Sequence, residues 1–451
     1  MKTVDIIERI EGEAHLKLDW KDGIVSNSQI KFLNFRGFEY ILEGKPALDA
    51  LVYTPRICGI CGQAHLLAAV NALENIYENA NIKLEVTQKA KLLRELGLAI
   101  EIIDSHIKWF YMFIMPDIVS LSSSDYSQYN PLKGSKWLRA NHKAGEVLKA
   151  LAIIGGQWPH TSYMVPGGVM SDPTLIDIAT IENYIDQTIM YYEDNIIGES
   201  LDNYLSFNSV SSIDNLKADL GDFSKISFEN NLNNIGRSYD RHLVISDMLG
   251  FKSGKLKHIN TSKININKIK EFDEYTFNAK AKKQQAKKYT WAKTVKYDND
   301  FYETGPLSRA LVNNRKFIKA IHKEFKDSAY TRVMARMDEL GFLLNKCKKI
   351  IRSINISEDS FIKPEIKLKD IESATAYGSV EAARGALLHT VEIQNGKIKK
   401  YDVTTPTVWN LGPGDDVTPG VAQKAINGST TTKEAKIILR SFDVCSVCTT
   451  H

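Results

Sequence analysis

The sequence contains two Cys-x-x-Cys pairs that are separated by almost the whole chain. Cys58 and Cys61 lie near the start, whereas Cys445 and Cys448 lie at the very end. Each pair can direct two thiolates at one metal ion, and four thiolates suit Zn, Ni, Fe or an iron–sulfur cluster. The two pairs can share a site only if the fold brings the distant ends of the chain together. This requirement constrains the fold more than any other feature.

Other uses of such pairs have to be weighed against a shared redox metal site. A structural zinc site with four cysteines is the commonest use, but zinc-ribbon pairs usually lie about 15–20 residues apart. A thioredoxin-like pair lies between a strand and a helix, and neither pair has that setting. An iron–sulfur site remains chemically open. Disulfides are disfavoured, because five unevenly placed cysteines, with Cys347 alone, indicate metal-binding thiolates in a reducing compartment.

Charge and hydropathy exclude several classes of protein. A formal net charge of +4 over 451 residues favours neither nucleic acid nor a membrane surface as a partner. No apolar run approaches the roughly 18–20 residues that span a bilayer. The first residues carry acids where a signal peptide needs an apolar stretch. We therefore expect a cytoplasmic protein with no membrane span and no export signal of its own, which could associate with a membrane through partners.

Several segments carry the alternating pattern of half-buried strands. Residues 14–20 and 24–30 flank an Asp-Gly turn, which predicts a β-hairpin. Residues 386–403 predict further strands around the Asn395-Gly396 turn. These strands lie toward the two ends of the chain.

Long amphipathic helices are predicted between these strands. Apolar residues recur every three or four positions over 66–115, and Pro116 is expected to end that run. A second helix is expected to start at Asp172-Pro173, a third helical region covers 306–353, and a last helix lies near 432–440. The fold class is therefore α+β and mainly α, with a central bundle of long helices and peripheral β-sheets from the N- and C-terminal segments.

We expect one domain spanning residues 1–451. Its β-rich N-terminal part (1–65) carries the first cysteine pair, and a helical core follows (66–353). A segment rich in Lys and Asn (253–296) is expected to be a solvated insertion in that core. The C-terminal α/β part (354–451) carries the second pair.

The residues around the cysteines add a specific resemblance. Arg56-Ile-Cys-Gly-Ile-Cys-Gly-Gln-Ala-His65 and Asp443-Val-Cys-Ser-Val-Cys-Thr-Thr-His451 resemble the paired signature of nickel–iron hydrogenase large subunits. Related respiratory-complex subunits share that fold but lack the cysteines. The resemblance extends to Arg9-Ile-Glu-Gly12, Arg36-Gly-Phe-Glu39, Gly155-Gly-Gln-Trp-Pro-His160, Pro166-Gly-Gly-Val169 and Glu381-Ala-Ala-Arg-Gly-Ala-Leu387.

The resemblance implies a ligand set for a binuclear centre. Cys58 and Cys445 would be terminal nickel ligands, and Cys61 and Cys448 would bridge nickel to an iron that carries carbon monoxide and two cyanides. Such ligands have to be installed by accessory proteins. The resemblance therefore also implies a maturation chaperone and an endopeptidase that cuts a C-terminal extension after His451.

The resemblance assigns roles to residues that would otherwise be unremarkable acids or chain ends. Glu11, which could be a turn residue or a surface acid, would relay protons beside a terminal thiolate. Glu39, His451 and the backbone carbonyl of Val403 would hold a Mg²⁺ (or Fe²⁺) ion near the C-terminus.

A further group is implied around the open position of the metal centre. Arg384 would overhang it, with Asp117 and Asp443 around the arginine, although each could serve only in a salt bridge, loop or helix end. His65 and His389 would donate hydrogen bonds to sulfur or cyanide.

Two positions depart from the family pattern. The family often has proline where this chain has Ala383 and Val444. Neither change removes a ligand, but both positions border the metal pocket. Gas access, oxygen sensitivity or catalytic bias could therefore differ.

The implied reaction is the reversible heterolytic oxidation of H₂ to two protons and two electrons, with the metals performing the chemistry. Cys347 cannot hold a cluster alone, so we expect no iron–sulfur cluster in this chain and an obligate iron–sulfur small subunit, in a heterodimer or a dimer of heterodimers. The Gly155–His160 motif and Arg237-Ser-Tyr-Asp-Arg241 resemble the cytoplasmic uptake or sensory branch. The alternatives are a hydrogen sensor of the same fold and a non-redox protein with a structural zinc. Metal analysis would separate the zinc protein from the other two, and the turnover rate would separate an uptake enzyme from a sensor.

Overall fold

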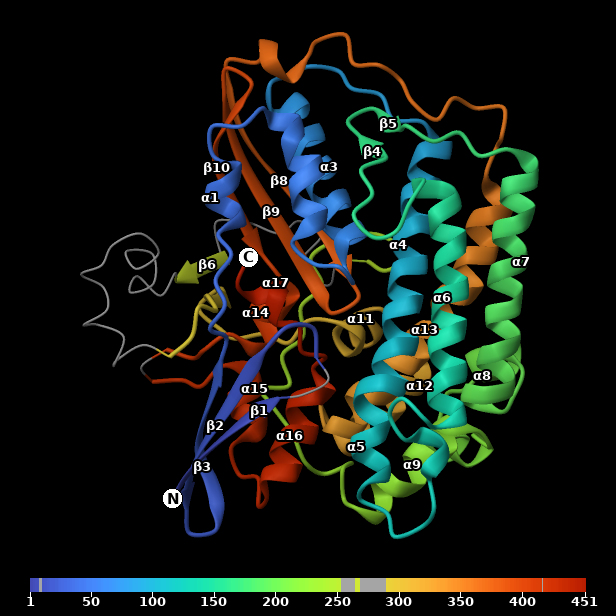
Figure 1. The fold of residues 1–451 in the computed structure, drawn as a ribbon, viewed down its shortest axis with the longest axis vertical. Coiled ribbons are helices and arrows are strands. Elements are labelled where there is room, and N and C mark those ends of the chain that lie inside the picture. The colour runs from blue at the N-terminus through green and yellow to red at the C-terminus, as the bar shows by residue number, and fades with distance from the viewer. Residues whose placement is uncertain (8–9, 253–263, 268–288, 416) are drawn as a thin grey trace.

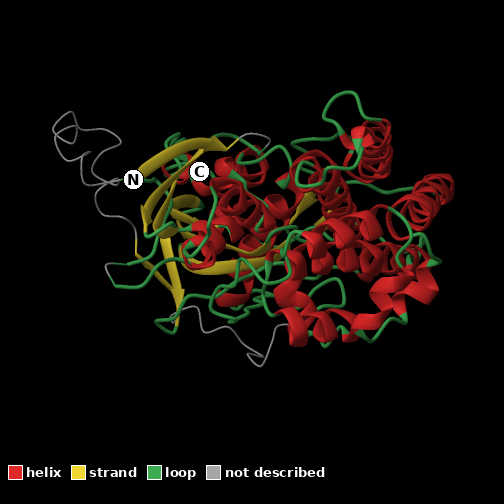
Figure 2. Cartoon of the chain, turned by 90° about the horizontal axis from the view of Figure 1, so that it is seen from below, coloured by secondary structure: helices red, strands yellow, loops and turns green. Residues whose placement is uncertain are grey.

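The computed structural model describes all residues except 8–9, 253–263, 268–288 and 416. Most of the segment expected to be an insertion at 253–296 therefore lies outside the described residues, as does Arg9. Figure 1 shows long helices along one side of the molecule and two three-stranded sheets on the other. The view in Figure 2 also separates the strands from most of the helices. This arrangement confirms the predicted fold class.

The N-terminal sheet is an antiparallel meander in the order β1-β2-β3. Its strands are β1 (Lys2–Ile7), β2 (Ala14–Lys21) and β3 (Ile24–Lys31). Ala14, Leu16 and Leu18 alternate on the buried face of β2. Asp22 and Gly23 both have positive φ angles, as a tight hairpin turn requires. The predicted hairpin is confirmed.

The helical bundle contains the long helices of the chain. Helix α4 packs against α6 and α13, and α7 also packs against α6 and α13. The predicted stripe on α4, from Leu93 to Ile107, is buried. The bundle helices are α4 (Gln88–Lys108), α6 (Ser135–Gly155), α7 (Leu175–Tyr191) and α13 (Ala329–Ser353). Helix α6 was not predicted.

Pro116 does not end the helical run that it was expected to stop. After α4 the chain passes through a π-helical segment, Trp109–Ile114, and continues as α5 (Met115–Val119). Pro116 lies in the first turn of α5, where a proline, which lacks an N–H, is tolerated. The 66–115 region also divides into two helices, α3 (Gly62–Asn79) and α4.

Helix α7 begins slightly later than predicted from Asp172-Pro173. Thr174 is its N-cap, and the Thr174 hydroxyl accepts a hydrogen bond from the backbone N–H of Asp177 (3.2 Å). The Asp177 carboxylate accepts one from the backbone N–H of Thr174 in return (2.8 Å). This reciprocal capping box, rather than the proline, sets the start of the helix.

The C-terminal sheet has the order β10-β9-β8 and is antiparallel. Its strands are β8 (Ser373–Ala382), β9 (Gly385–Gln394) and β10 (Lys397–Thr404). Asn395 and Gly396 form the predicted turn, with positive φ angles. Strand β8 was not predicted, and it packs against α3, the helix that follows the first cysteine pair.

Shorter elements complete the described chain. The region 306–353 contains three helices, α11 (Pro306–Val312), α12 (Lys316–Phe325) and α13, as a helical prediction there requires. Two small sheets pair β4 (Met164–Val165) with β5 (Gly168–Val169) and β6 (Ile264–Asn267) with β7 (Thr294–Tyr297). The remaining helices are α1 (Phe38–Leu42), α2 (Ala50–Tyr53), α8 (Leu201–Leu205), α9 (Asp219–Glu229), α14 (Pro406–Leu411), α15 (Val421–Ile426), α16 (Thr432–Ser441) and α17 (Ser446–Thr449).

The two ends of the chain meet, as the cysteine pairs demand. Buried residues of the N-terminal sheet, among them Leu16 and Leu18, share one apolar cluster with Leu439 and Phe442 of the C-terminal segment. Glu11 and Cys445 form a parallel β-bridge. Within the described part of the chain, no helix is long and apolar enough to cross a membrane.

Candidate metal centre

The four paired cysteines lie together in the interior. The Sγ atoms of Cys58 and Cys445 are 3.7 Å apart, and those of Cys61 and Cys448 are 3.1 Å apart. All four side chains are buried and none forms a disulfide. The central expectation from the sequence, that both pairs contribute to one site, therefore agrees with the geometry.

The first pair lies in the turn that starts helix α3. The Cys58 sulfur accepts hydrogen bonds from the backbone N–H groups of Ile60 and Cys61, both at 3.4 Å. The next residue is Gly62. A Cβ at that position would lie 2.8 Å from the carbonyl oxygen of Pro55, so a larger side chain would not fit. The glycine lets the turn pack closely enough for α3 to begin directly behind the sulfurs.

Glu101 fixes the start of α3 from the neighbouring helix α4. Its carboxylate accepts hydrogen bonds from the backbone N–H groups of Gln63 (2.6 Å) and Ala64 (3.0 Å). Burial raises the pKa of Glu101 well above its ordinary value, although the two amides oppose this shift. Sequence reasoning missed this residue, because its position inside a helical stripe gives no sign of a polar partner.

The second pair surrounds the short helix α17. Cys445 precedes the helix, and the hydroxyl of Thr449 donates to the Cys445 carbonyl oxygen (2.8 Å). The hydroxyl of Thr405 donates to the Cys448 carbonyl oxygen (2.7 Å). The backbone on each side of the two sulfurs is therefore held by a buried side-chain hydrogen bond.

Arg36 joins the two cysteine segments directly. Its Nη2 donates to the carbonyl oxygen of Ile57, beside Cys58, and to that of Val447 (2.6 Å), beside Cys448. One guanidinium thus bridges residues from the two ends of the chain. The Arg36–Glu39 motif marked the region in the sequence, but not this role.

Glu11 lies against both cysteine segments. Its carbonyl oxygen accepts a hydrogen bond from the backbone N–H of Ser446 (2.8 Å). A Cβ on Gly59 would come within 4.0 Å of Glu11 Oε1. Burial, with the charge of Cys58, raises the pKa of the Glu11 carboxyl, although Arg384 opposes the shift. A carboxyl with a raised pKa beside the sulfurs is suited to accept and release protons.

Arg384 and Asp443 form a buried ion pair beside the sulfurs, with Arg384 Nη2 at 3.1 Å from Asp443 Oδ1. Burial would lower the pKa of Arg384, but the charges of Asp443 and the cysteines hold it well above its ordinary value. Its Nε and Nη1 atoms have no hydrogen-bond partner among the described residues. Buried donors without partners are rare, so these atoms are suited to a ligand of the metal centre.

Asp117 forms an ion pair with another arginine, Arg440. Asp117 lies in α5, and its carboxylate pairs with the guanidinium of Arg440 in α16. Both residues line a surface pocket together with Asp5 and Lys436. The place of Asp117 in the acid set around Arg384 stays a prediction, and the contact described here is the one with Arg440.

His65 and His389 form a hydrogen-bonded chain behind Cys448. The Cys448 sulfur lies 3.9 Å from His65 Nε2, and His65 Nδ1 lies 3.0 Å from His389 Nε2. His389 Nδ1 is 2.8 Å from the hydroxyl of Tyr401. Burial lowers the pKa of His65 to about 3 and that of His389 well below its ordinary value, so both rings are neutral.

The three residues expected to hold a magnesium ion do lie together. His451 Nε2 is 2.9 Å from the carbonyl oxygen of Val403 and 3.4 Å from Glu39 Oε1. However, the ammonium of Lys293 bonds to that same carboxylate oxygen and to the Val403 carbonyl oxygen (3.0 Å). This oxygen set, with a lysine already bound to it, does not fit an added divalent cation.

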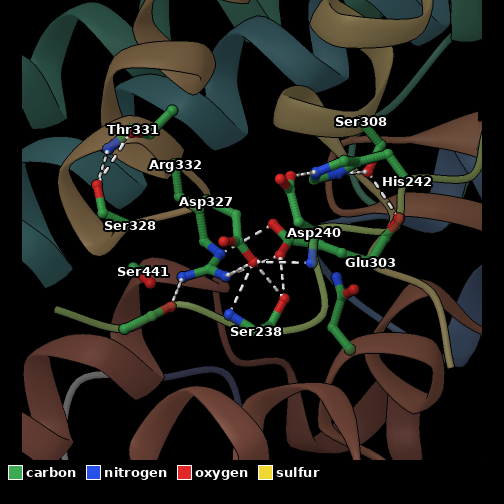
Figure 3. A network of polar contacts seen from close by, with 12 residues as sticks. Ser238, Asp240, His242, Glu303, Ser308, Asp327, Ser328, Thr331, Arg332 and Ser441 are labelled. Carbon is green, nitrogen blue, oxygen red and sulfur yellow. Dashed lines mark hydrogen bonds and ion pairs between the residues drawn. The ribbon is translucent and has the colours of Figure 1, made fainter. Parts of the chain in front are cut away.

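A network of buried ions supports the segment that leads into the second pair (Figure 3). Arg332 lies between Glu303 (2.8 Å) and Asp327 (3.6 Å), and Asp327 accepts a hydrogen bond from the Ser238 hydroxyl (2.6 Å). The Arg332 guanidinium also stacks 3.9 Å above the ring of Phe442. The Arg237–Arg241 loop is thereby tied to the residues just before Asp443.

The donor set fits a nickel–iron centre. Four buried sulfurs meet from two pairs. Beside them, Arg384 presents two donor atoms that have no partner in the described part of the chain, which a closed four-thiolate zinc site does not need. Despite burial, hydrogen bonds from the three other thiols, together with Arg384, bring the pKa of Cys58 well below its ordinary value. Hydrogen bonding among the thiols and burial raise the pKa values of Cys61 and Cys448 well above it. The cluster therefore favours one thiolate at Cys58, which is suited to bind a cation.

Comparison with known proteins agrees with this geometry. Residues 36–142 and 127–451 match the family of nickel-dependent hydrogenases. The chain is 25% identical to the periplasmic NiFeSe hydrogenase large subunit of Desulfomicrobium baculatum, over 92% of this chain and 86% of that protein. It is 23% identical to the sulfhydrogenase 1 subunit alpha of Pyrococcus furiosus, over 100% and 97%. The Ni-Fe-Se hydrogenase of D. vulgaris Hildenborough shares its fold, with a TM-score of 0.81 at 23% identity and full coverage of both chains. The chain therefore belongs to the nickel-dependent hydrogenase family.

Proposed function

We propose that this chain is the catalytic large subunit of a nickel–iron hydrogenase that oxidises H₂ reversibly to two protons and two electrons. The observation that carries the proposal is the meeting of four buried cysteine sulfurs from opposite ends of the chain. Cys58, Cys61, Cys445 and Cys448 would hold nickel and iron, and carbon monoxide and two cyanides would complete the iron. The bound metals would supply the heterolytic cleavage of H₂.

The surrounding residues would manage charge and protons. Arg384, paired with Asp443, offers a fixed cation to the open side of the centre. Glu11 would accept the proton and pass it outward, since burial raises its pKa toward the working range of a proton relay. His65 and His389, both neutral, would orient the sulfur of Cys448.

Partners follow from the electron balance. Two electrons leave each H₂, and the fifth cysteine, Cys347, lies alone in α13, where it cannot hold a cluster. We therefore propose a heterodimer with an iron–sulfur small subunit, and a maturation chaperone and endopeptidase for assembly. The magnesium ion expected at Glu39, Val403 and His451 is not part of this proposal, because Lys293 binds those oxygens.

The test is made on the purified complex. We expect about one nickel per chain, infrared bands of bound carbon monoxide and cyanide, and H₂-dependent dye reduction. Zinc without nickel would reject the proposal. Glu11→Gln should keep the nickel and the infrared bands but lower turnover by roughly 10²–10⁴-fold, the usual contribution of a proton-transfer group.

A matched control lies two residues away. Glu13 is an acid with a half-exposed side chain that bonds to His15 (2.7 Å). Glu13→Gln should leave turnover unchanged. Equal losses in both variants would show that Glu11 is not the relay.

A further inference from the structure

Lys293 reaches from the loop before β7 into the site below the C-terminal residue. Its ammonium bonds to Glu39 Oε1 and, at 3.0 Å, to the carbonyl oxygen of Val403. The Val403 N–H donates to the same Glu39 oxygen (2.6 Å). The side chains of Lys293 and Glu39 are 12% and 8% exposed, so water screens this pair only weakly.

A divalent ion would have to use the oxygens that the ammonium already uses. Mg²⁺ binds oxygen at about 2.0–2.1 Å in an octahedral arrangement and keeps several waters. Placing it on Glu39 Oε1 and the Val403 carbonyl would put two cations side by side on one carboxylate oxygen. A dication there would also leave a net positive charge, whereas Lys293 and Glu39 neutralise each other.

Both ring nitrogens of His451 face backbone carbonyl oxygens in this site. Its Nδ1 lies 2.9 Å from the carbonyl oxygen of Cys448, and its Nε2 lies 2.9 Å from that of Val403. A carbonyl oxygen only accepts hydrogen bonds, so the ring nitrogen that carries the hydrogen donates it to one of these two oxygens.

The backbone around Lys293 holds its side chain on this site. The N–H of Trp291 donates to the carbonyl oxygen of Phe32 (2.9 Å), and the Trp291 ring stacks on Phe35 at 4.7 Å. Phe35 directly precedes the Arg36–Glu39 motif. The lysine and its carboxylate partner are therefore carried by two segments that pack against each other.

We infer that the ammonium of Lys293 takes the place of a divalent cation in this protein, and that Glu39, Val403 and His451 form an ion-pair anchor for the C-terminal segment without a third metal. The anchor lies three residues beyond Cys448 and is joined to it by the His451 hydrogen bond. Although burial favours the neutral acid, Lys293 keeps the pKa of Glu39 well below its ordinary value, so the anchor stays charged at neutral pH.

The test uses the complete complex with its small subunit and combines metal analysis with thermal unfolding. We expect nickel, plus iron in amounts that the nickel–iron centre and the small subunit account for, with less than about 0.1 magnesium, manganese or zinc per chain. EDTA should leave the unfolding temperature unchanged. About one magnesium per chain, or a lower unfolding temperature in EDTA, would overturn the inference. The nickel count reports separately on the proposed hydrogenase function.

Two variants test the lysine itself. Lys293→Ala opens space at the oxygens, so its unfolding temperature should fall and then rise by about 2–3 °C with saturating Mg²⁺, as mass action on a newly formed site predicts. Lys293→Met fills the space without charge, and it should be destabilised and unresponsive to Mg²⁺. Unfolding temperatures equal to wild type in both variants would overturn the inference.

Lys296→Ala is the matched control. Lys296 lies in β7, three residues after Lys293, and pairs with Asp415 and not with Glu39. Its loss removes the same charge, and it should not make stability depend on Mg²⁺. A Mg²⁺ response of equal size in this variant would overturn the assignment to Lys293. If neither Lys293 variant folds, the metal count of the wild type still decides the question.

Discussion

Arg309 offers the sharpest test of how buried charge supports the metal pocket. Its guanidinium, fully buried in α11, donates to both oxygens of Glu339 (2.6 and 2.7 Å) and to Glu381 (2.9 Å). It also donates to the carbonyl oxygens of Ala382 (3.0 Å) and Ala383 (3.3 Å). The two residues directly before Arg384 are thus held by one side chain. We predict that Arg309→Met destabilises the protein and displaces Arg384.

The magnitude follows from the charges that the change leaves behind. Removing one partner of a buried ion pair costs about 3–5 kcal/mol, because the other charge stays buried. An unfolding entropy of about 2.1 cal/mol/K per residue gives about 0.9 kcal/mol/K for 451 residues. The unfolding temperature should therefore fall by about 3–5 °C. A shift of Arg384 by about 1 Å would lower turnover by roughly 10²-fold.

The pH dependence identifies the mechanism. Although burial opposes ionisation, Arg309 holds the pKa of Glu339 to about 2. The wild type therefore loses this stabilisation only as pH falls from 4.5 toward 2. Without the arginine, burial raises the pKa of Glu339. The unpaired carboxylate therefore lowers the stability of the variant more as pH rises. The difference in unfolding temperature between Arg309→Met and wild type should be smaller at pH 5 than at pH 8.

A second substitution separates charge from packing. Glu339→Gln added to Arg309→Met removes the unpaired carboxylate and should recover at least about 1 kcal/mol. Thermal unfolding of wild type, Arg309→Met and the double variant at matched metal content measures this recovery. If the double variant is no more stable than Arg309→Met, or if Arg309→Met unfolds like wild type, the reasoning about buried charge is refuted.

Three further predictions concern groups in or near the site. Burial lowers the pKa of His106 to about 4, so below pH 6.5 the unfolded chain takes up a proton that the folded chain refuses. Stability should fall from pH 6.5 toward 4, and His106→Gln should make this slope in unfolding temperature shallower; an unchanged slope would contradict the pKa. Glu101→Leu leaves two amides of α3 without an acceptor, costs about 1–3 kcal/mol and should lower the nickel content, whereas Glu101→Gln keeps an acceptor. Equal nickel contents in the two variants would count against this capping role. Thr405→Val removes the hydrogen bond to Cys448 and should lower the unfolding temperature by about 1 °C. The control is Thr407→Val, whose buried hydroxyl has no partner among the described residues and should cost nothing.

Features written in short stretches of sequence could be predicted. The hairpin formed by β2 and β3 needs only alternating side chains and an Asp-Gly turn, both local signals. The α4 stripe likewise depends on spacing alone. The cysteine pairs were recognisable because thiolates at that spacing have few uses, and a shared site required the two ends to meet.

Partners across the fold could not be predicted in the same way. Pro116 was expected to end a helix, and nothing local indicated that a π-helical segment would precede it. Asp117 pairs with Arg440 because α5 lies beside α16, a tertiary fact. Lys293 belongs to a lysine-rich stretch that the sequence presents as solvated, so its buried partners, Glu39 and the carbonyl oxygen of Val403, become visible only in the fold.

Backbone contacts join the two cysteine segments around the metal centre. Arg36 joins carbonyl groups beside Cys58 and Cys448, and the Ser446 N–H bonds to the carbonyl oxygen of Glu11. None of these contacts uses a sulfur atom, because every acceptor is a backbone oxygen. The two cysteine segments are therefore joined through contacts that leave the sulfurs available to a metal ion, whose charge would offset the repulsion between thiolates in a pocket of low dielectric. On this reasoning the affinity for nickel depends on backbone anchors as much as on the sulfurs themselves.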